Sequence, residues 1–331
     1  MIQYKVCVVT VTYGDRWHLL NQVLARLLSF VNVAHIIVVD NASGYSVKSK
    51  VEHSQITVLS NNTNEGSAGG YNRGIAYAAE HLDSDFIWLL DDDNMPQEDA
   101  LPELLRHWNN IQGTNTQKAL FCRRPDRVIH TKIAMGANPS SYYLTANNFL
   151  GFSLARIISN KIRKVIERFK QPGDFLDKAV MPYVPYGGLM LHREMVEKIG
   201  YPNADFFLYV DDSEYSYRIT QQGAKIYLIP TALVVDIDIS QGINYKQRLF
   251  RTQLLDLWSF RTYYHVRNRI YFYSRVAVTN KLMFGVNKIL YLSWLWIVSV
   301  ISNKKSAYYK LLGAVNDGLT GKLGKAGQEK F

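Results

Sequence analysis

The chain contains 331 residues, of which 47% are hydrophobic and 20% are charged, and its formal net charge is +10. This composition is ordinary for a globular protein, and the length allows a large core in one or two domains. Only two cysteines occur, Cys7 and Cys122, which excludes a disulfide framework and a cysteine-based zinc site and fits a reducing cytosol.

The positive charge is concentrated near the C-terminus. Residues 1–240 contain 23 Lys and Arg against 25 Asp and Glu, a net charge of −2, whereas residues 241–331 contain 15 against 3, a net charge of +12. A basic segment rich in aromatic residues predicts an anionic partner, either membrane phospholipid or nucleic acid. No nucleic-acid-binding module is recognisable, so we expect a membrane surface and no nucleic acid. We predict two domains that meet between residues 240 and 241.

Strand and helix patterns alternate over the first half of the chain. Because the first strand pattern begins almost at the N-terminus, we expect no signal peptide. The alternation predicts an α/β fold with a mostly parallel sheet and helices on both faces. The predicted strands are Val6–Val11, Ile36–Val39, Ile56–Leu59 and Phe86–Leu90, and the predicted helices are Arg16–Phe30 and Gly66–Leu82.

The second strand ends at Asp40, where a carboxylate is placed to accept ribose hydroxyls or a base N–H. A turn-forming aspartate is an equally simple interpretation. The first turn, at Thr12 and Tyr13, lacks the spaced glycines of dinucleotide enzymes. The glycine-rich start of the next helix, from Asn64 through Gly66 to Arg73, is typical either of phosphate binding or of tight packing.

Three consecutive carboxylates, Asp91, Asp92 and Asp93, follow the fourth strand. Side chains two apart on a strand share a face, so Asp91 and Asp93 are predicted to hold one divalent cation, with Asp92 turned aside. Oxygen ligands of this kind suit Mg²⁺ or Mn²⁺. The alternative is a solvated acidic turn.

Residues 153–170 show the pattern of a basic amphipathic helix, which fits either a membrane surface or the protein core. Tyr186 precedes a pair of glycines that let the chain pass close to a ligand, and its ring is expected either against a sugar or in the core.

A second acid cluster, Asp211 and Asp212, follows the apolar run Phe206–Val210, which we interpret as a strand. One carboxylate of the pair is predicted to act as a general base. The alternative is helix capping, with Glu214 and Arg218 forming an i,i+4 ion pair.

A further strand, Ala232–Val235, is followed by Asp236 and Asp238, which face either a metal or solvent. Three further candidates lie near residue 265. Arg267 and Arg269 are candidates for phosphate, and His265 is a candidate for metal or phosphate, with a structural histidine as the alternative.

The tail carries the apolar run Ile289–Ile301 in a basic frame. Its 13 residues fall short of the roughly 20 needed to span a bilayer, so we expect a helix in the membrane interface or, alternatively, a core or oligomer contact. Gly313–Gly327 is expected to be mobile or bound to a surface.

Four motifs in this order resemble the family-2 glycosyltransferases with a GT-A fold. They are Thr12–Tyr13 with Val38–Ser43, Asn64–Gly74, Asp91–Asp93, and Asp211–Arg218. The resemblance covers about residues 4–275 and is greatest to bacterial galactofuranosyltransferases, which share the three-Asp motif and a His-x-Arg-Asn-Arg segment. Related rhamnosyltransferases more often have Asn-Pro-Asp in place of the three aspartates.

The resemblance implies a role for each matching residue. Asp212 matches the catalytic base, with Asp211 beside it, and Mn²⁺ or Mg²⁺ is implied at Asp91 and Asp93. The family's third metal ligand, a histidine, is replaced here by Asp236 or Asp238, with His265 as a further candidate. The residues expected around the nucleotide and its diphosphate are Thr12, Tyr13, Asp40, Asn64, Gly66, Arg73, Asp92 and Arg267.

The implied activity is inverting transfer of a sugar, with UDP-galactofuranose preferred over dTDP-rhamnose as donor. The expected acceptor is a lipid-linked glycan or polysaccharide of the bacterial cell surface. The expected location is cytoplasmic, at the inner face of the plasma membrane. A catalytically idle protein that binds a nucleotide sugar is the alternative, and the intact acid pair at 211 and 212 argues against it.

Overall fold

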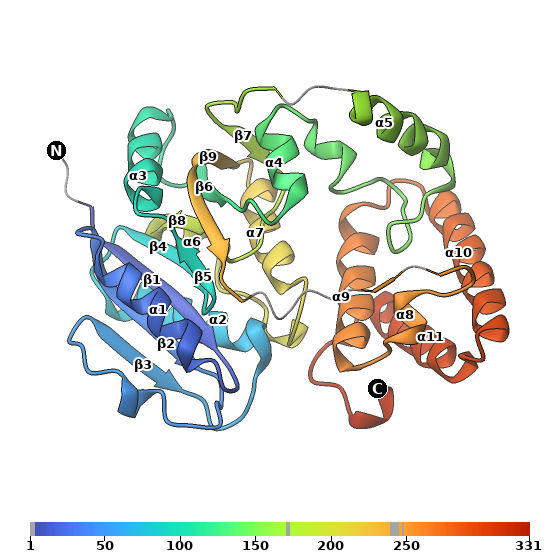
Figure 1. The fold of residues 1–331 in the computed structure, drawn as a ribbon, viewed down its shortest axis with the longest axis horizontal. Coiled ribbons are helices and arrows are strands. Elements are labelled where there is room, and N and C mark those ends of the chain that lie inside the picture. The colour runs from blue at the N-terminus through green and yellow to red at the C-terminus, as the bar shows by residue number, and fades with distance from the viewer. Residues whose placement is uncertain (1–3, 170–172, 239–244, 247) are drawn as a thin grey trace. The chain divides into compact units, whose positions relative to one another are not determined.

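The computed structural model describes residues 4–169, 173–238, 245–246 and 248–331 (Figure 1). The chain forms two compact units, and each of them is discontinuous in sequence. The first contains residues 1–139, 174–207 and 211–241, and the second contains 140–173, 208–210 and 242–331. Two segments from before residue 240 therefore group with the C-terminal helices.

A nine-stranded sheet forms the centre of the first unit, in the order β3-β2-β1-β4-β8-β6-β9-β5, with β7 paired to β9. The pairings make β1, β2, β3, β4, β6 and β9 run in one direction and β5, β7 and β8 in the other. The predicted mostly parallel α/β sheet is thus confirmed. The strands are β1 Val6–Thr12, β2 Val33–Asp40, β3 Ile56–Ser60, β4 Phe86–Asp91, β5 Asn94–Pro96, β6 Lys118–Arg123, β7 Ala179–Met181, β8 Leu189–His192 and β9 Lys225–Asp236.

Helices cover both faces of this sheet because the strand side chains alternate between them. Val6 and Val8 belong to the core that Leu20 and Val23 of α1 complete. On the opposite face, α2 lies so close to β1 that a Cβ on Gly70 would come within 2.6 Å of Val11. The helices of this unit are α1 Trp17–Leu28, α2 Gly66–His81, α3 Ala100–Asn110, α4 Val128–Ala134, α6 Arg193–Ile199 and α7 Asp211–Gln221, with the 3₁₀ turns η1 Lys48–Lys50 and η4 Ala204–Phe206.

The second unit is helical in its described residues, as predicted for the C-terminal region. α11 packs on α9, where Gly318 lies against the carbonyl of Arg267 and Tyr263 donates to Asp317 at 2.7 Å. The expectation that 313–327 is mobile is wrong for residues 313–320, which form the end of α11, and its alternative, a surface-bound segment, stays a prediction. The elements are η3 Leu154–Arg156, α5 Ile157–Phe169, α8 Gln253–Asp256, α9 Phe260–Val276, α10 Lys281–Ile301, α11 Lys305–Thr320 and η6 Gln328–Lys330, and η2 Pro139–Ser141 begins where the first unit ends.

Helix α10 is longer than the apolar run that predicted it. Its 21 residues have a mean hydropathy of 1.5 over the best window, so by length and composition it is able to cross a membrane. Only 22% of that window is buried. The prediction that this segment is too short to span a bilayer is therefore wrong. The helix begins eight residues before the apolar run, at Lys281, where Asn280 caps it.

Two further sequence predictions fail locally. Phe206–Val210 is not a strand: η4 ends at Phe206, and the following residues turn with positive φ angles. The predicted strand Ala232–Val235 is the second half of a longer strand, β9, which continues past Pro230 because the pairing with β6 shifts register there and leaves Pro230 outside the ladder.

Candidate functional site

The predicted acidic residues lie at the carboxyl ends of neighbouring parallel strands. In the sheet register, Thr12 pairs with Asp40, Val11 pairs with Asp91, and Asp40 pairs with Ser60. Ligands of open α/β sheets bind at this edge. The first half of the site is therefore assembled by strand pairing alone.

Asp92 is a buried partner of Arg16. The Arg16 guanidinium donates from Nε to Asp92 at 2.9 Å, from Nη2 to Asp93 at 2.6 Å and from Nη1 to Asp238 at 2.7 Å. Thr12 donates to the other Asp92 oxygen at 2.7 Å. Burial raises the pKa of Asp92 to about 7, and Arg16 opposes that rise. Asp92 thus faces the protein, as expected of the residue turned aside.

Asp91, Asp93 and Asp236 gather around one fully buried amide, that of Asn94. Asn94 Nδ2 donates to Asp93 Oδ1 at 3.0 Å and to Asp236 Oδ1 at 2.7 Å, and Asn94 Oδ1 accepts from the backbone N–H of Asp91 at 3.2 Å. Arg124, also buried, bonds Asp236 and lies 4.0 Å from Asp91. One amide and one guanidinium therefore hold three carboxylates from β4, the following turn and β9.

The Asp91 side chain is the most accessible of these, with 45% of it exposed. The orientation of the Asp91 carboxylate is fixed by the buried Tyr71 hydroxyl, which donates to Asp91 Oδ1 at 2.8 Å. The backbone of Gly187 closes the other side, where a Cβ would come within 3.0 Å of Asp91 and still closer to Asn94 and Arg124. The backbone of Gly187 therefore passes close to these site residues, and its predicted close approach to a ligand stays a prediction.

Among the described residues, no three His, Cys, Asp or Glu side chains are arranged as a complete metal site. The donors nevertheless fit Mg²⁺ or Mn²⁺, which are commonly held by one or two carboxylates together with substrate phosphates. Asp91 and Asp93 remain the candidates. Asp238 is bound by Arg16. His265 belongs to the second unit, where its ring faces Tyr209 and burial lowers its pKa to about 4.

The second acid pair occupies the first turn of α7. Asp211 is buried and accepts from Ser67 at 2.9 Å, and Asp212 is half-buried and accepts from the backbone N–H of Ser213 at 2.6 Å. Burial raises the pKa of both carboxyls. The negative charge of Asp212 raises the pKa of Asp211 further, and the negative charge of Asp91 raises the pKa of Asp212. The predicted pair between Glu214 and Arg218 is present at 2.8 Å.

Three of the residues predicted around the nucleotide, Asn64, Gly66 and Arg73, are linked to one another through Asn41 and Asn61. Asn41 donates to Asn64 at 3.1 Å and to the carbonyl of Gly66 at 2.9 Å, and Asn61 donates to Asn41 at 3.0 Å. Arg73 bonds Asn61 and the carbonyl of Ser60. Asp40 accepts from Ser43 N–H at 2.9 Å, as in a turn, and Tyr13 is exposed.

The start of α2 is covered by the chain itself. Gly66 has a φ of +71°, and the Phe207 carbonyl lies where its Cβ would be. The same carbonyl accepts from Ala68 N–H at 3.2 Å. The packing interpretation of these glycines is therefore correct, and a phosphate-binding role for Gly66 stays a prediction.

Sequence reasoning gave no role to several residues that this site uses. Arg124 and Arg127 looked like isolated basic residues, yet Arg127 contacts Asp126 at 3.0 Å and Asp236 at 3.8 Å. Arg16 and Asn94 were also missed. The arginines could have been anticipated from electrostatics, because adjacent carboxylates need nearby positive charges. Arg267, by contrast, is buried within the second unit and donates to the carbonyl of Gly324 at 2.6 Å.

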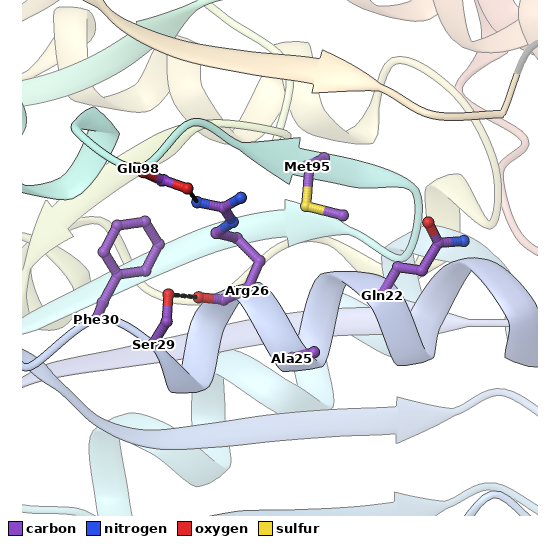
Figure 2. A pocket seen from close by; sticks show the side chains of 7 residues that line it. All are labelled: Gln22, Ala25, Arg26, Ser29, Phe30, Met95 and Glu98. Carbon is purple, nitrogen blue, oxygen red and sulfur yellow. Dashed lines mark hydrogen bonds and ion pairs between the residues drawn. The ribbon is translucent and has the colours of Figure 1, made fainter.

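A hollow lies apart from these carboxylates, between α1 and the segment after β5 (Figure 2). Across it, Arg26 forms an ion pair with Glu98 at 3.0 Å. None of the predicted site residues lines this hollow, and its charged groups neutralise each other, so we assign it no role.

Comparisons with known proteins agree with this geometry. The model of the family Glycosyl transferase family 2 matches residues 7–200. The chain is 24% identical to the low-salt glycan biosynthesis hexosyltransferase Agl10 of Haloferax volcanii, covering 88% of this chain and 85% of the relative. It is 25% identical to galactofuranosyltransferase GlfT1 of Mycolicibacterium smegmatis, covering 66% of each, and 22% identical to dTDP-rhamnosyl transferase RfbF of Shigella flexneri, covering 97% of each.

Two solved structures share the GT-A fold of this chain. The mannosyltransferase PcManGT of Pyrobaculum calidifontis, solved with GDP-Man and Mn²⁺, aligns with a TM-score of 0.54 and 16% identity over 97% of this chain and 89% of its own. GalNAc-T7, solved with UDP, GalNAc and Mn²⁺, aligns with a TM-score of 0.53 and 16% identity over 82% of this chain and 50% of its own.

Proposed function

Because the chain belongs to glycosyl transferase family 2, whose members transfer a sugar from a donor, we propose that it works by direct displacement with inversion, using a nucleotide sugar and a divalent cation. The gathering of Asp91, Asp93 and Asp236 around Asn94, in the same unit as Asp212, carries this proposal. A sheet edge that presents only a solvated acidic turn needs no buried amide to hold its carboxylates together.

A divalent cation is supported by the balance of charge. Three guanidinium groups, those of Arg16, Arg124 and Arg127, face six carboxylates, those of Asp91, Asp92, Asp93, Asp126, Asp236 and Asp238. Asp91 and Asp93 would hold the cation, which neutralises the departing diphosphate when bound.

Asp212 is the general base in this proposal. As the acceptor hydroxyl oxygen attacks the anomeric carbon, the bond from that carbon to the diphosphate breaks, and the hydroxyl proton passes to the Asp212 carboxylate. No covalent sugar–enzyme intermediate forms, so one carboxylate suffices. The raised pKa of Asp212 suits a base that works near neutral pH. Asp211, buried behind it, supports the turn through Ser67.

We assign UDP-galactofuranose as the preferred donor, because the three-Asp motif and the His-x-Arg-Asn-Arg segment resemble galactofuranosyltransferases. The second candidate, dTDP-rhamnose, is favoured by the similarity to a dTDP-rhamnosyl transferase over 97% of the chain. The nucleoside would lie at Asp40, beside the Asn41–Asn61–Asn64 network.

The acceptor is proposed to be a lipid-linked or polysaccharide glycan of the bacterial surface, met at the inner face of the plasma membrane. Three features of the second unit support a membrane location: the exposed apolar residues of α10, those of η3 and α5, and the charge of +12 over residues 241–331. Apolar side chains beside excess positive charge suit an anionic lipid surface.

A donor screen tests this function. Thermal stability is measured with UDP and with dTDP, each with and without Mn²⁺, and transfer is then measured with the matching nucleotide sugars. We expect stabilisation by UDP that depends on Mn²⁺. Stabilisation by dTDP alone would overturn the donor assignment in favour of rhamnose, and no response to any nucleotide would overturn the function.

The base assignment is tested separately with Asp212→Asn, which keeps the size of the side chain and removes the proton acceptor. We expect kcat to fall by about 10²- to 10⁴-fold while UDP still stabilises the protein. Transfer at the wild-type rate would show that Asp212 is not the base.

A further inference from the structure

The four residues before the acid pair have an unusual backbone. Phe207, Tyr209 and Val210 have φ angles of +63°, +66° and +66°, and none of them is glycine. A β-branched residue such as Val210 rarely adopts this conformation. Such geometry persists only where the surroundings impose it, and it concentrates at functional sites.

The side chain that bonds the carbonyls of residues 208 and 209 is Asn268 of α9. Asn268 is fully buried, and its Nδ2 donates to the carbonyl of Leu208 at 2.8 Å and to that of Tyr209 at 2.9 Å. Both amide hydrogens are therefore used to hold two successive carbonyls. Leu208–Val210 accordingly groups with the second unit, although Phe207 and Asp211 on either side group with the first.

The amide of Asn268 is itself held in the orientation that this requires. Arg267 Nε donates to Asn268 Oδ1 at 2.8 Å, which turns Nδ2 toward the two carbonyls. Arg267 is fixed in turn by its 2.6 Å bond from Nη1 to the carbonyl of Gly324. The His-x-Arg-Asn-Arg segment thus has a use inside the protein that differs from phosphate binding.

We propose that Asn268 is a positioning residue for the acid pair at the start of α7. Val210 is bonded covalently to Asp211, so the point at which α7 begins follows the positions of the Leu208 and Tyr209 carbonyls. Holding these carbonyls restricts the backbone that leads directly into the first turn of α7, and thereby the freedom of the Asp212 carboxylate. This inference rests on the proposed role of Asp212 as the base. Asn268 touches no reacting atom and acts only through the chain that it holds.

Asn287 of α10 offers a matched control within the same unit. It is also fully buried, its Oδ1 accepts from Leu154 N–H at 2.9 Å, and its Nδ2 donates to the carbonyl of Asn147 at 2.8 Å. Asn→Asp at either position keeps the shape and the acceptor oxygen, removes the donation to backbone carbonyls and adds a carboxyl group at a position that is fully buried in both cases. A loss that reflects general damage to a buried asparagine would appear in both variants.

The experiment compares Asn268→Asp with Asn287→Asp in the full chain. For Asn268→Asp we expect kcat to fall at least about ten-fold with the donor KM within about two-fold, because misplacing a reacting group affects turnover more than binding. Hydrogen exchange should quicken in the peptide that spans residues 207–212. For Asn287→Asp we expect kcat within about two-fold of wild type and unchanged exchange in that peptide.

Wild-type kcat in Asn268→Asp, or an equal loss of kcat in both variants, would overturn the proposal. If Asn268→Asp does not fold, Asn268→Ser, which introduces no charge, carries the same comparison. The exchange measurement separates this inference from the proposed function. Quickened exchange in a protein without transferase activity would count against the function only, whereas unchanged exchange in an active enzyme would count against the role of Asn268.

Discussion

The three adjacent aspartates after β4 have three different environments, although they look equivalent in sequence. Asp91 is half-exposed, Asp93 is shared between Arg16 and Asn94, and Asp92 is buried between Arg16 and Thr12. A buried carboxylate that bonds a guanidinium contributes to stability, whereas an accessible one is available to a ligand. Burial therefore assigns Asp92 to stability and leaves Asp91 available to a ligand.

Single substitutions should separate these two uses. Asp92→Ala leaves both Arg16 Nε and the Thr12 hydroxyl without their acceptor in a buried place, so we expect the free energy of unfolding to fall by about 1–3 kcal/mol. Asp91→Asn removes a half-exposed charge, so we expect stability within about 0.5 kcal/mol of wild type and loss of the Mn²⁺-dependent shift in Tm. Urea unfolding and thermal shift measure both effects. The reverse pattern would mean that Asp92, and not Asp91, binds the cation.

The raised pKa of Asp211 predicts how stability depends on pH. In the unfolded chain an aspartate loses its proton near pH 3.9, whereas in the fold burial and Asp212 hold the proton to higher pH. Between these values the native state binds more protons, so the contribution of Asp211 to stability falls as pH rises.

Asp211→Asn mimics the protonated form and abolishes that loss. We expect the variant to be more stable than wild type by about 1–3 kcal/mol at about pH 8, with a smaller difference at about pH 5. The introduced amide still accepts from Ser67 through its carbonyl oxygen. Chemical denaturation across pH measures the difference, and a gain in stability that grows toward low pH would contradict the assignment.

At the scale of elements, helix α2 shows why glycines gather at the start of a helix. Gly70 and Gly74 let α2 approach β1 so closely that a Cβ would come within 2.6 Å of Val11 and 2.5 Å of Val9. This close approach places Tyr71 under Asp91 and Ser67 beside Asp211. Packing of one helix therefore serves both acid clusters.

Gly70→Ala tests this dependence. The added methyl group has no space, so we expect a loss of about 1–3 kcal/mol in the free energy of unfolding. Gly44→Ala is the control, because nothing lies within 4 Å of its Cβ position and its φ is not positive. We expect that control to stay within about 0.5 kcal/mol of wild type. Equal effects of the two substitutions, measured by urea unfolding, would contradict the packing role.

Sequence reasoning found the helices and strands whose residue pattern allows a single interpretation. The strand at 86–90 and the helix at 66–82 follow from unbroken apolar or periodic runs, and both are present. The segment 206–210 is equally apolar, yet it is not a strand, because the Asn268 side chain and the Ala68 N–H donate to its carbonyls from distant parts of the sequence. Arg16, Arg124 and Asn94 were missed for the same reason, since their partners lie up to 222 residues away.

At the scale of the whole molecule, charge and exposed apolar surface coincide in the second unit. On α10, Leu282, Ile289 and Ile297 are between 53% and 78% exposed, whereas the buried Asn287 and Leu295 face the other way. Ile158 and Ile162 of α5 add to the exposed apolar residues of that unit. Soluble surfaces rarely carry so many large apolar side chains together, and such surfaces mark interaction sites.

Ile289→Asp tests the proposed membrane contact. Ile289 is 63% exposed, so the fold does not depend on it, whereas a carboxylate there opposes both insertion of the side chain and attraction to anionic lipid. We expect binding to phosphatidylglycerol vesicles to weaken at least about ten-fold, with unchanged Tm and unchanged transfer to a water-soluble acceptor.

Asn316→Asp adds the same charge to an exposed position on α11 of the same unit and should weaken binding much less. Co-sedimentation at low and high salt measures both variants. If the two variants bind equally well, the apolar face of α10 is not the membrane contact, and the positive charge of the C-terminal region alone must account for any binding.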